Sequence, residues 1–199
     1  MTLRTPILLT ALVFLAACSS VPPPALYVLK EITTTEGTAP KPVTEGAQKT
    51  VLLGPVAVPD YLDRTDIVRR ATDSRLGISD NERWGETLRA GLQRVLTADL
   101  AARLGPGYWV GTGTGHGGTP DFEIPVDVGT FEQEASGRVV LSAGWEVRSA
   151  GDEHLLTRKR TVYARVPVAS STEAVVDAMS AVLAELAGDL AATLRAGRK

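Results

Sequence analysis

The residue with the most specific chemistry in this 199-residue chain is its single cysteine, Cys18. It follows Arg4, an apolar run over residues 7–15 and two alanines. An apolar run of this length is typical of a signal peptide and is too short to span a hydrocarbon core of about 30 Å. A single cysteine also excludes an intramolecular disulfide and a cysteine-rich zinc site.

Residues 15–18, Leu-Ala-Ala-Cys, resemble a lipobox, the signature at which bacterial lipoproteins are cleaved and acylated. The resemblance implies a signal peptide over residues 1–17, a lipidated Cys18 that anchors the chain in a membrane, and a proline-rich tether over residues 18–26. Ser19, where inner-membrane lipoproteins have aspartate, implies the outer membrane and a domain facing the periplasm. Several acyl chains anchor firmly, whereas a single chain binds marginally. The alternative is a buried cysteine that happens to follow a signal peptide.

Few other residues are of a type that does chemistry. The two histidines, His116 and His154, are expected on the surface, so no zinc site is predicted. Gly113, Gly115 and Gly118 have the spacing of a dinucleotide-binding fingerprint, but that fingerprint needs a helix directly after it, and here a strand is expected. No nucleophile, base and orienting group come together in the sequence. We therefore expect no enzyme activity, no catalytic residue, no metal and no cofactor.

Two charged clusters allow a functional and an ordinary interpretation. The basic triplet at residues 158–160, Arg-Lys-Arg, could contact anionic phospholipid head groups or an acidic partner, or it could simply face water. Asp121, Glu123 and Asp127 alternate along one strand face, where they could bind a cation or be solvated. A net charge of −2 and 5% aromatic residues argue against a nucleic-acid partner.

Two segments place apolar residues at helical spacing. The first follows a capping box formed by Ser79 and Glu82 and ends at Gly105. The second follows the same spacing of Ser170 and Glu173 and runs over residues 172–195.

Apolar runs and strict alternation predict the strands. They are expected at residues 27–29, 51–58, 65–69, 108–112, 122–128, 139–147 and 155–168, with the run at 51–58 buried on both faces and the last three forming an antiparallel meander. The order of strands, helix, strands and helix predicts an α+β fold with a mixed, mainly antiparallel sheet and two helices packed on one face. Length and an ordinary 44% apolar content predict a single domain over residues 27–199.

Two stretches behind the lipobox carry a family resemblance. They are residues 53–64, Leu-Gly-Pro-Val-Ala-Val-Pro-Asp-Tyr-Leu-Asp-Arg, and residues 81–88, Asn-Glu-Arg-Trp-Gly-Glu-Thr-Leu. Together they resemble the PqiC-like lipoproteins, described as auxiliary lipoprotein components of ABC-type transport systems. The resemblance implies a non-enzymatic outer-membrane subunit of an intermembrane lipid transport or envelope integrity system. It also implies docking of an MCE-domain (PqiB-like) protein and assembly of copies into a ring. The glycine-rich loop at residues 111–119 departs from the family and is given no role.

Four residues are candidates for the partner interface: Tyr61, Leu62, Arg64 and Arg69. The turn after Pro59 is expected to expose Tyr61 and Leu62, and Arg64 and Arg69 flank them. An aromatic residue with nearby arginines is a typical centre of a protein interface. The alternative is that Tyr61 and Leu62 fold back to cap the core. A second functional hypothesis is a periplasmic scaffold or regulator of cell-wall or envelope assembly, although the tether before Tyr27 is short for that role.

Overall fold

The computed structural model describes residues 23–31, 49–113, 119–149 and 154–196. The predicted signal peptide and Cys18 lie outside these residues, as does His116. Their predictions therefore remain predictions.

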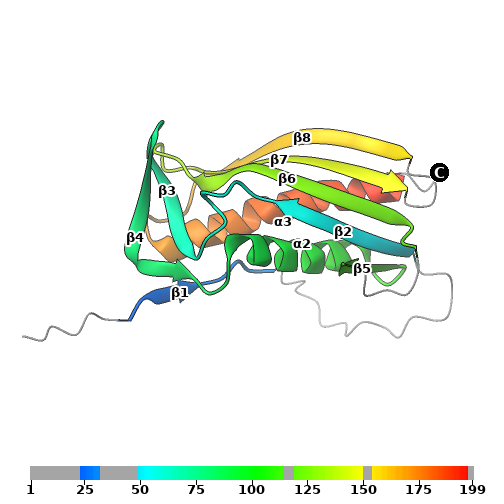
Figure 1. Cartoon of the computed structure of the whole chain (residues 1–199), viewed down its shortest axis with the longest axis horizontal. Helices are drawn as coiled ribbons and strands as arrows, with labels where there is room; N and C mark the ends of the chain where they lie inside the picture. The colour runs from blue at the N-terminus through cyan, green and yellow to red at the C-terminus, as the bar shows by residue number, and fades with distance from the viewer. Residues whose placement is uncertain (1–22, 32–48, 114–118, 150–153, 197–199) are drawn as a thin grey trace, which may run out of the picture.

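The described residues form one mixed sheet of eight strands, with two helices on one of its faces (Figure 1). The strands are β1 (Ala25–Tyr27), β2 (Lys49–Ala57), β3 (Asp66–Thr72), β4 (Arg75–Trp84), β5 (Tyr108–Thr112), β6 (Phe122–Gln133), β7 (Val139–Ser149) and β8 (Leu155–Arg165). The helices are α2 (Leu88–Leu104) and α3 (Thr172–Ala196). The predicted α+β class is confirmed.

β6 is the central strand of this sheet. It pairs antiparallel with β7 on one side, and β7 pairs antiparallel with β8, as the predicted meander requires. On its other side it pairs parallel with β2, which pairs parallel with β5. The hairpin of β3 and β4 joins the end of β6 where Arg69 is opposite Gln133, and β1 adds parallel to β4. Parallel neighbours need a long crossover, and α2 lies in the connection between β2 and β5.

Side chains alternate between the helix-covered face and the outer face of the sheet. In β2, Val51 and Leu53 are fully buried, whereas Leu52 between them is partly exposed. The prediction that this strand is buried on both faces is wrong, because in the described part of the chain α2 and α3 both lie on the same face.

The first helix begins later than its sequence pattern predicts. Residues 75–84 form β4, and α2 starts at Leu88 with the Thr87 hydroxyl accepting a hydrogen bond from the amide of Ala90. The predicted capping pair, Ser79 and Glu82, is in the strand instead. Pairing with β3 and β1 overrides the local helical pattern there, because long-range partners decide weak propensities. The predicted end holds: Gly105 has a φ of 77°, which suits glycine.

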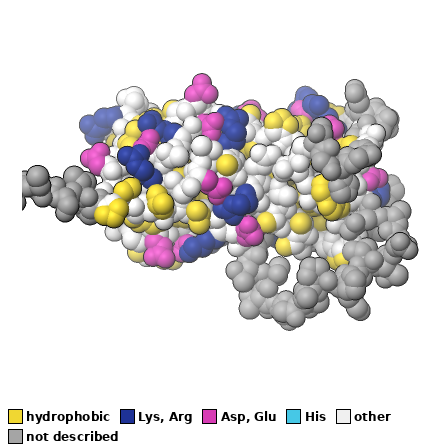
Figure 2. Space-filling view, turned by 60° about the horizontal axis from the view of Figure 1, so that its bottom comes forward, with side chains coloured by type: hydrophobic (Ala, Val, Ile, Leu, Met, Phe, Trp, Pro, Cys, Tyr) yellow, Lys and Arg dark blue, Asp and Glu magenta, His cyan; other side chains and the backbone are white. Residues whose placement is uncertain are grey.

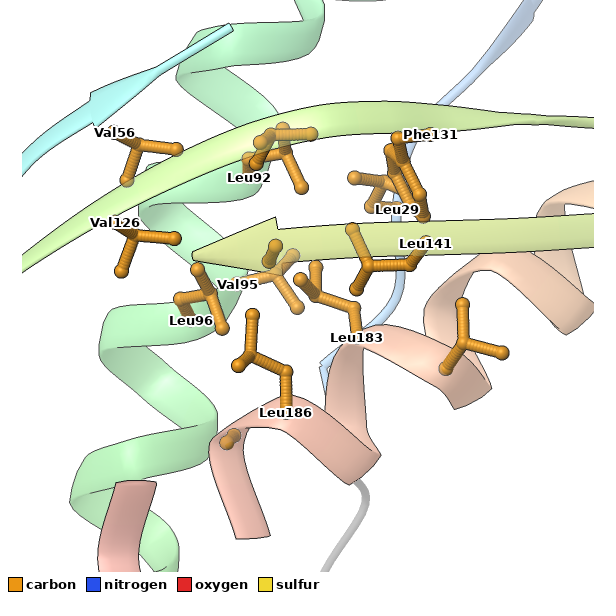
Figure 3. Packing of buried hydrophobic residues seen from close by; sticks show 14 of the residues in the cluster. Leu29, Val56, Leu92, Val95, Leu96, Val126, Phe131, Leu141, Leu183 and Leu186 are labelled. Atoms are coloured by element: carbon orange, nitrogen blue, oxygen red, sulfur yellow. The ribbon is translucent and has the colours of Figure 1, made fainter. Parts of the chain in front are cut away.

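The second helix begins where expected, at Thr172, and the Ser171 side chain accepts a hydrogen bond from the amide of Ala174. Both helices pack their apolar stripes on the sheet and on each other (Figure 3). The labelled core residues are Leu29, Val56, Leu92, Val95, Leu96, Val126, Phe131, Leu141, Leu183 and Leu186. Within the described chain, neither helix combines the length and hydropathy of a membrane-spanning helix.

The exposed charges are of mixed sign. On the face shown in Figure 2, basic and acidic side chains lie next to one another. Elsewhere in the described chain, exposed charges also form ion pairs, such as Arg94 with Glu31 and Glu86. The face shown in Figure 2 therefore does not attract ligands of one charge strongly.

Candidate functional site

The turn between β2 and β3, residues 58–65, contains three of the four predicted interface residues. Its backbone is compact, because the amides of Leu62 and Asp63 both donate to the carbonyl of Pro59, at 2.9 and 3.2 Å. Arg89 of α2 also holds the turn in place, because it donates to the Asp63 carboxylate at 2.8 Å and to the Val56 carbonyl at 3.3 Å. The turn is therefore held in one shape by its own backbone hydrogen bonds and by Arg89 of α2.

Leu62 does not lie on the surface. Its side chain is only 2% exposed and packs in the core beside Trp84 and Leu88. The expectation that Leu62 is presented to a partner is wrong, and the alternative, that it caps the core, is right for this residue. The physical reason is that the compact turn folds back over an otherwise open end of the core.

Tyr61 is half-buried and lies beside the ion pair of Arg70 and Glu132. Arg70 Nε donates to Glu132 Oε1 at 2.5 Å, and Glu132 is 1% exposed. Burial, followed by the negative charge of Glu132, raises the pKa of Tyr61 above its usual range. Tyr61 is thus fixed over a charged pair while part of it stays accessible.

Arg64 and Asp66 form an ion pair at the edge of the turn, with 2.6 Å between Nε and Oδ2. Arg83 of β4 bonds the other oxygen of Asp66. The hydrogen bond from Arg64, aided by Arg83, lowers the pKa of Asp66 below its usual range. The Arg64 side chain remains 44% exposed, so it can contact a partner without leaving Asp66.

Arg69 links three elements. Its guanidinium hydrogen-bonds Thr172 at the start of α3 and lies 3.7 Å from the Glu82 carboxylate of β4. Thr172 in turn donates to Glu82 at 2.5 Å. Arg69 therefore cross-links the fold, and its side chain is 32% exposed, less than that of Arg64.

Sequence reasoning missed the residues that hold this site, namely Asp63, Arg70, Arg89 and Glu132. Glu132 offered the clearest signal, since its even position continues the two-residue spacing of the buried residues 122–128 in β6, and a buried carboxylate needs a partner. That the partner is Arg70 follows only from the pairing of β3 with the end of β6.

The motif at residues 54–55, Gly-Pro, also has a structural explanation. It lies where the register between β2 and β6 shifts, between Leu53 and Val56. A Cβ at Gly54 would lie 3.2 Å from the Cα of Pro125, so glycine permits the close approach of the two strands. Two prolines without amide hydrogens, Pro55 and Pro125, fit such an irregularity.

No group of three potential metal ligands occurs among the residues that the structure describes. His154 is exposed directly before β8, as expected, while the glycine-rich loop lies mostly outside the described residues.

Known proteins share both sequence and fold with this chain. The "Intermembrane transport lipoprotein PqiC" of Escherichia coli K12 is 32% identical over 96 residues, which are 48% of this chain and 50% of that protein, and its Shigella flexneri counterpart matches equally. The chain spans about half the length of the curated relatives it matches. A crystal structure of an uncharacterized protein superposes with a TM-score of 0.71 at 21% identity over 87% of this chain and 99% of that one. Protein XCC0632 from Xanthomonas campestris superposes with a TM-score of 0.66 at 15% identity, covering 87% and 98%.

These two structures show that the fold recurs in other proteins. The sequence model of one family, described as "ABC-type transport auxiliary lipoprotein component", matches residues 27–191, which is most of the chain and nearly all of the described domain. The chain therefore belongs to the family of ABC-type transport auxiliary lipoprotein components.

Proposed function

We propose that the chain is a lipid-anchored, non-enzymatic subunit of an intermembrane lipid transport system, attached to the outer membrane and facing the periplasm. The observation that carries the proposal is the family match over residues 27–191 directly behind a lipobox that ends at Cys18. The relatives named as intermembrane transport lipoproteins support the same role. Ser19 after the cysteine supports the outer membrane.

Its partner in this proposal is an MCE-domain protein that bridges the two membranes. Several copies of this chain form a ring that binds this protein. The contact surface includes Tyr61, Arg64 and Arg69, while Leu62 supports it from the core. A turn already fixed by Asp63 and Arg89 loses little conformational entropy on binding. Tyrosine and arginine at the centre of an interface contribute about 2 kcal/mol or more each.

The test is co-purification of the mature chain with an MCE-domain protein of the same organism. Combining Tyr61→Ala with Arg64→Ala should reduce recovery of the partner or break the homo-oligomer, while circular dichroism and melting temperature change little. Arg195→Ala is the matched control, because Arg195 lies at the far end of α3 from Thr172, which Arg69 contacts.

Normal assembly of the double variant would place the interface elsewhere. Unfolding of the double variant would show that Tyr61 and Arg64 only support the fold. Failure of the unmodified chain to bind any MCE-domain protein would overturn the partner itself.

A further inference from the structure

The face of the sheet away from the helices carries a hollow of about 520 Å³. Its residues alternate with buried core residues, so Gly144 and Glu146 of β7 lie opposite the face that holds Trp145 and Val147. The floor is formed by small or rigid residues of three strands: Pro55, Ala57, Pro125 and Gly144. The hollow exists because none of these residues fills the space above the sheet.

The side chains around the hollow are mainly basic. Arg148, Arg158 and Arg160 line it together with two carboxylates, Asp127 and Glu146, which leaves an excess of one positive charge, three minus two. The Lys159 ammonium lies 5.4 Å from the Trp145 ring, on the other face of the sheet. The formal charge of the whole chain is −2, so this local excess runs against the overall balance. A concave, positively charged surface concentrates anions.

Two of these arginines are held side by side. Arg148 Nε donates to Glu146 Oε2 at 2.8 Å, and Arg158 Nε donates to Glu146 Oε1 at 2.5 Å. The bonds from Arg148 and Arg158 lower the pKa of Glu146 below its usual range, so it stays ionised and keeps both guanidinium groups in place. Each arginine retains further N–H donors for a ligand, since a guanidinium has five.

Arg160 is the cation available to a ligand. Its guanidinium lies across the sheet toward the floor: Nη2 is 3.7 Å from the position that a Cβ on Gly144 would occupy, and Nη1 is 4.0 Å from that on Gly129. No carboxylate of the described residues lies within ion-pair distance of Arg160, whereas Arg165 on the same strand pairs with Glu185 at 2.8 Å. A larger side chain at position 144 would displace this guanidinium.

We propose that this hollow binds the phosphate group of an anionic ligand, through Arg160 and Arg158 with Arg148 at its side. Planar guanidinium groups match phosphate oxygens in paired, charge-assisted hydrogen bonds. The apolar floor of Pro55, Ala57 and Pro125 suits the glycerol and first methylenes of a phospholipid head group. Free phosphate is the other source of the same chemistry. The hollow shares no residue with the turn at residues 58–65, so phosphate binding and partner docking can be tested independently.

The experiment uses the acylated mature chain in a non-ionic, phosphate-free detergent. The probes are inorganic phosphate, glycerophosphoglycerol and dihexanoyl-phosphatidylglycerol, and binding is followed by the amide NMR shifts of Gly144 and Gly129. We expect the two head-group probes to shift both amides, with affinity that falls as salt rises. If inorganic phosphate binds as tightly as both, the phosphate site stands and the lipid source is rejected.

Arg160→Gln should weaken binding about tenfold, which is the loss of one charge-assisted hydrogen bond. Arg165→Gln is the matched control, because Arg165 is on the same strand but paired with Glu185 of α3. The proposal is overturned if none of the three probes shifts the Gly144 amide, or if Arg160→Gln binds within twofold of the unchanged chain. It is also overturned if Arg160→Gln impairs only the binding of a protein partner, which would point to an acidic polypeptide in the hollow.

Discussion

Arg70 and Glu132 form an ion pair at the place where β3 meets the end of β6, with 2.5 Å between Nε and Oε1. The Glu132 side chain is 2% exposed and that of Arg70 is 26% exposed. Tyr61 lies beside the pair, so the turn after β2 is positioned on a charge that is almost fully removed from water. The accessible part of the proposed docking surface thus rests on an ion pair whose carboxylate is buried.

Removing one member of this pair should destabilise the fold more than removing both. Arg70→Met leaves the Glu132 carboxylate buried without its partner, and we expect a loss of about 2–4 kcal/mol in the free energy of unfolding. Arg70→Met with Glu132→Met should recover most of that loss. Urea denaturation of the unchanged chain, the single variant and the double variant measures the loss and its recovery. Equal stability of the single and double variants would contradict the interpretation.

Leu62→Ala and Tyr61→Ala should differ in their effect on the stability of the fold, although the two residues are neighbours in the sequence. Leu62→Ala empties a fully buried site and should cost about 2–5 kcal/mol of stability. Tyr61→Ala should cost clearly less, since the ring is only half-buried. Thermal unfolding of both variants tests the placement, and an unchanged melting temperature for Leu62→Ala would contradict its burial.

The pattern of residues predicted most of the fold because its apolar spacing follows the core directly. Strands 108–112 and 139–147 and the start of α3 were predicted closely, since alternation and helical spacing are local properties. The start of α2 was predicted wrongly because Ser79 and Glu82 satisfy a local capping pattern, while their backbone pairs with strands distant in sequence.

The candidate site was harder to predict for the same reason. Tyr61 and Leu62 are adjacent and similarly apolar, and only the fold-back of the turn over Trp84 separates a partly exposed residue from a core residue. The partners Arg70 and Glu132 are 62 positions apart. A sequence shows that a buried carboxylate needs a cation, but the choice of cation follows from strand order.

Stability should fall at low pH through Asp66. Its folded-state pKa lies below the ordinary value of 3.8 because Arg64 and Arg83 bond the ionised form. The stabilisation is therefore fully present above pH 3.8 and is lost as the pH falls through the lower folded-state value. Urea denaturation between pH 6 and about pH 2.5 should show this decline. Asp66→Asn should flatten it, and an identical pH dependence in this variant would contradict the role of Asp66.

The last prediction concerns the anchor. Cys18 is the only thiol in the chain and follows Leu-Ala-Ala behind an apolar run, so the mature protein should begin at Cys18 and carry acyl chains. Mass spectrometry of the N-terminal peptide should show cleavage before residue 18 and the added lipid mass. Cys18→Ser should leave the chain unprocessed or free in the periplasm, because a hydroxyl does not replace the acylated sulfur. Ser19→Asp is the matched control: it should be acylated normally but move the protein from the outer to the inner membrane fraction. A free thiol at Cys18, or Met1 retained in the mature protein, would contradict lipidation, and with it the membrane attachment on which the proposed transport role depends.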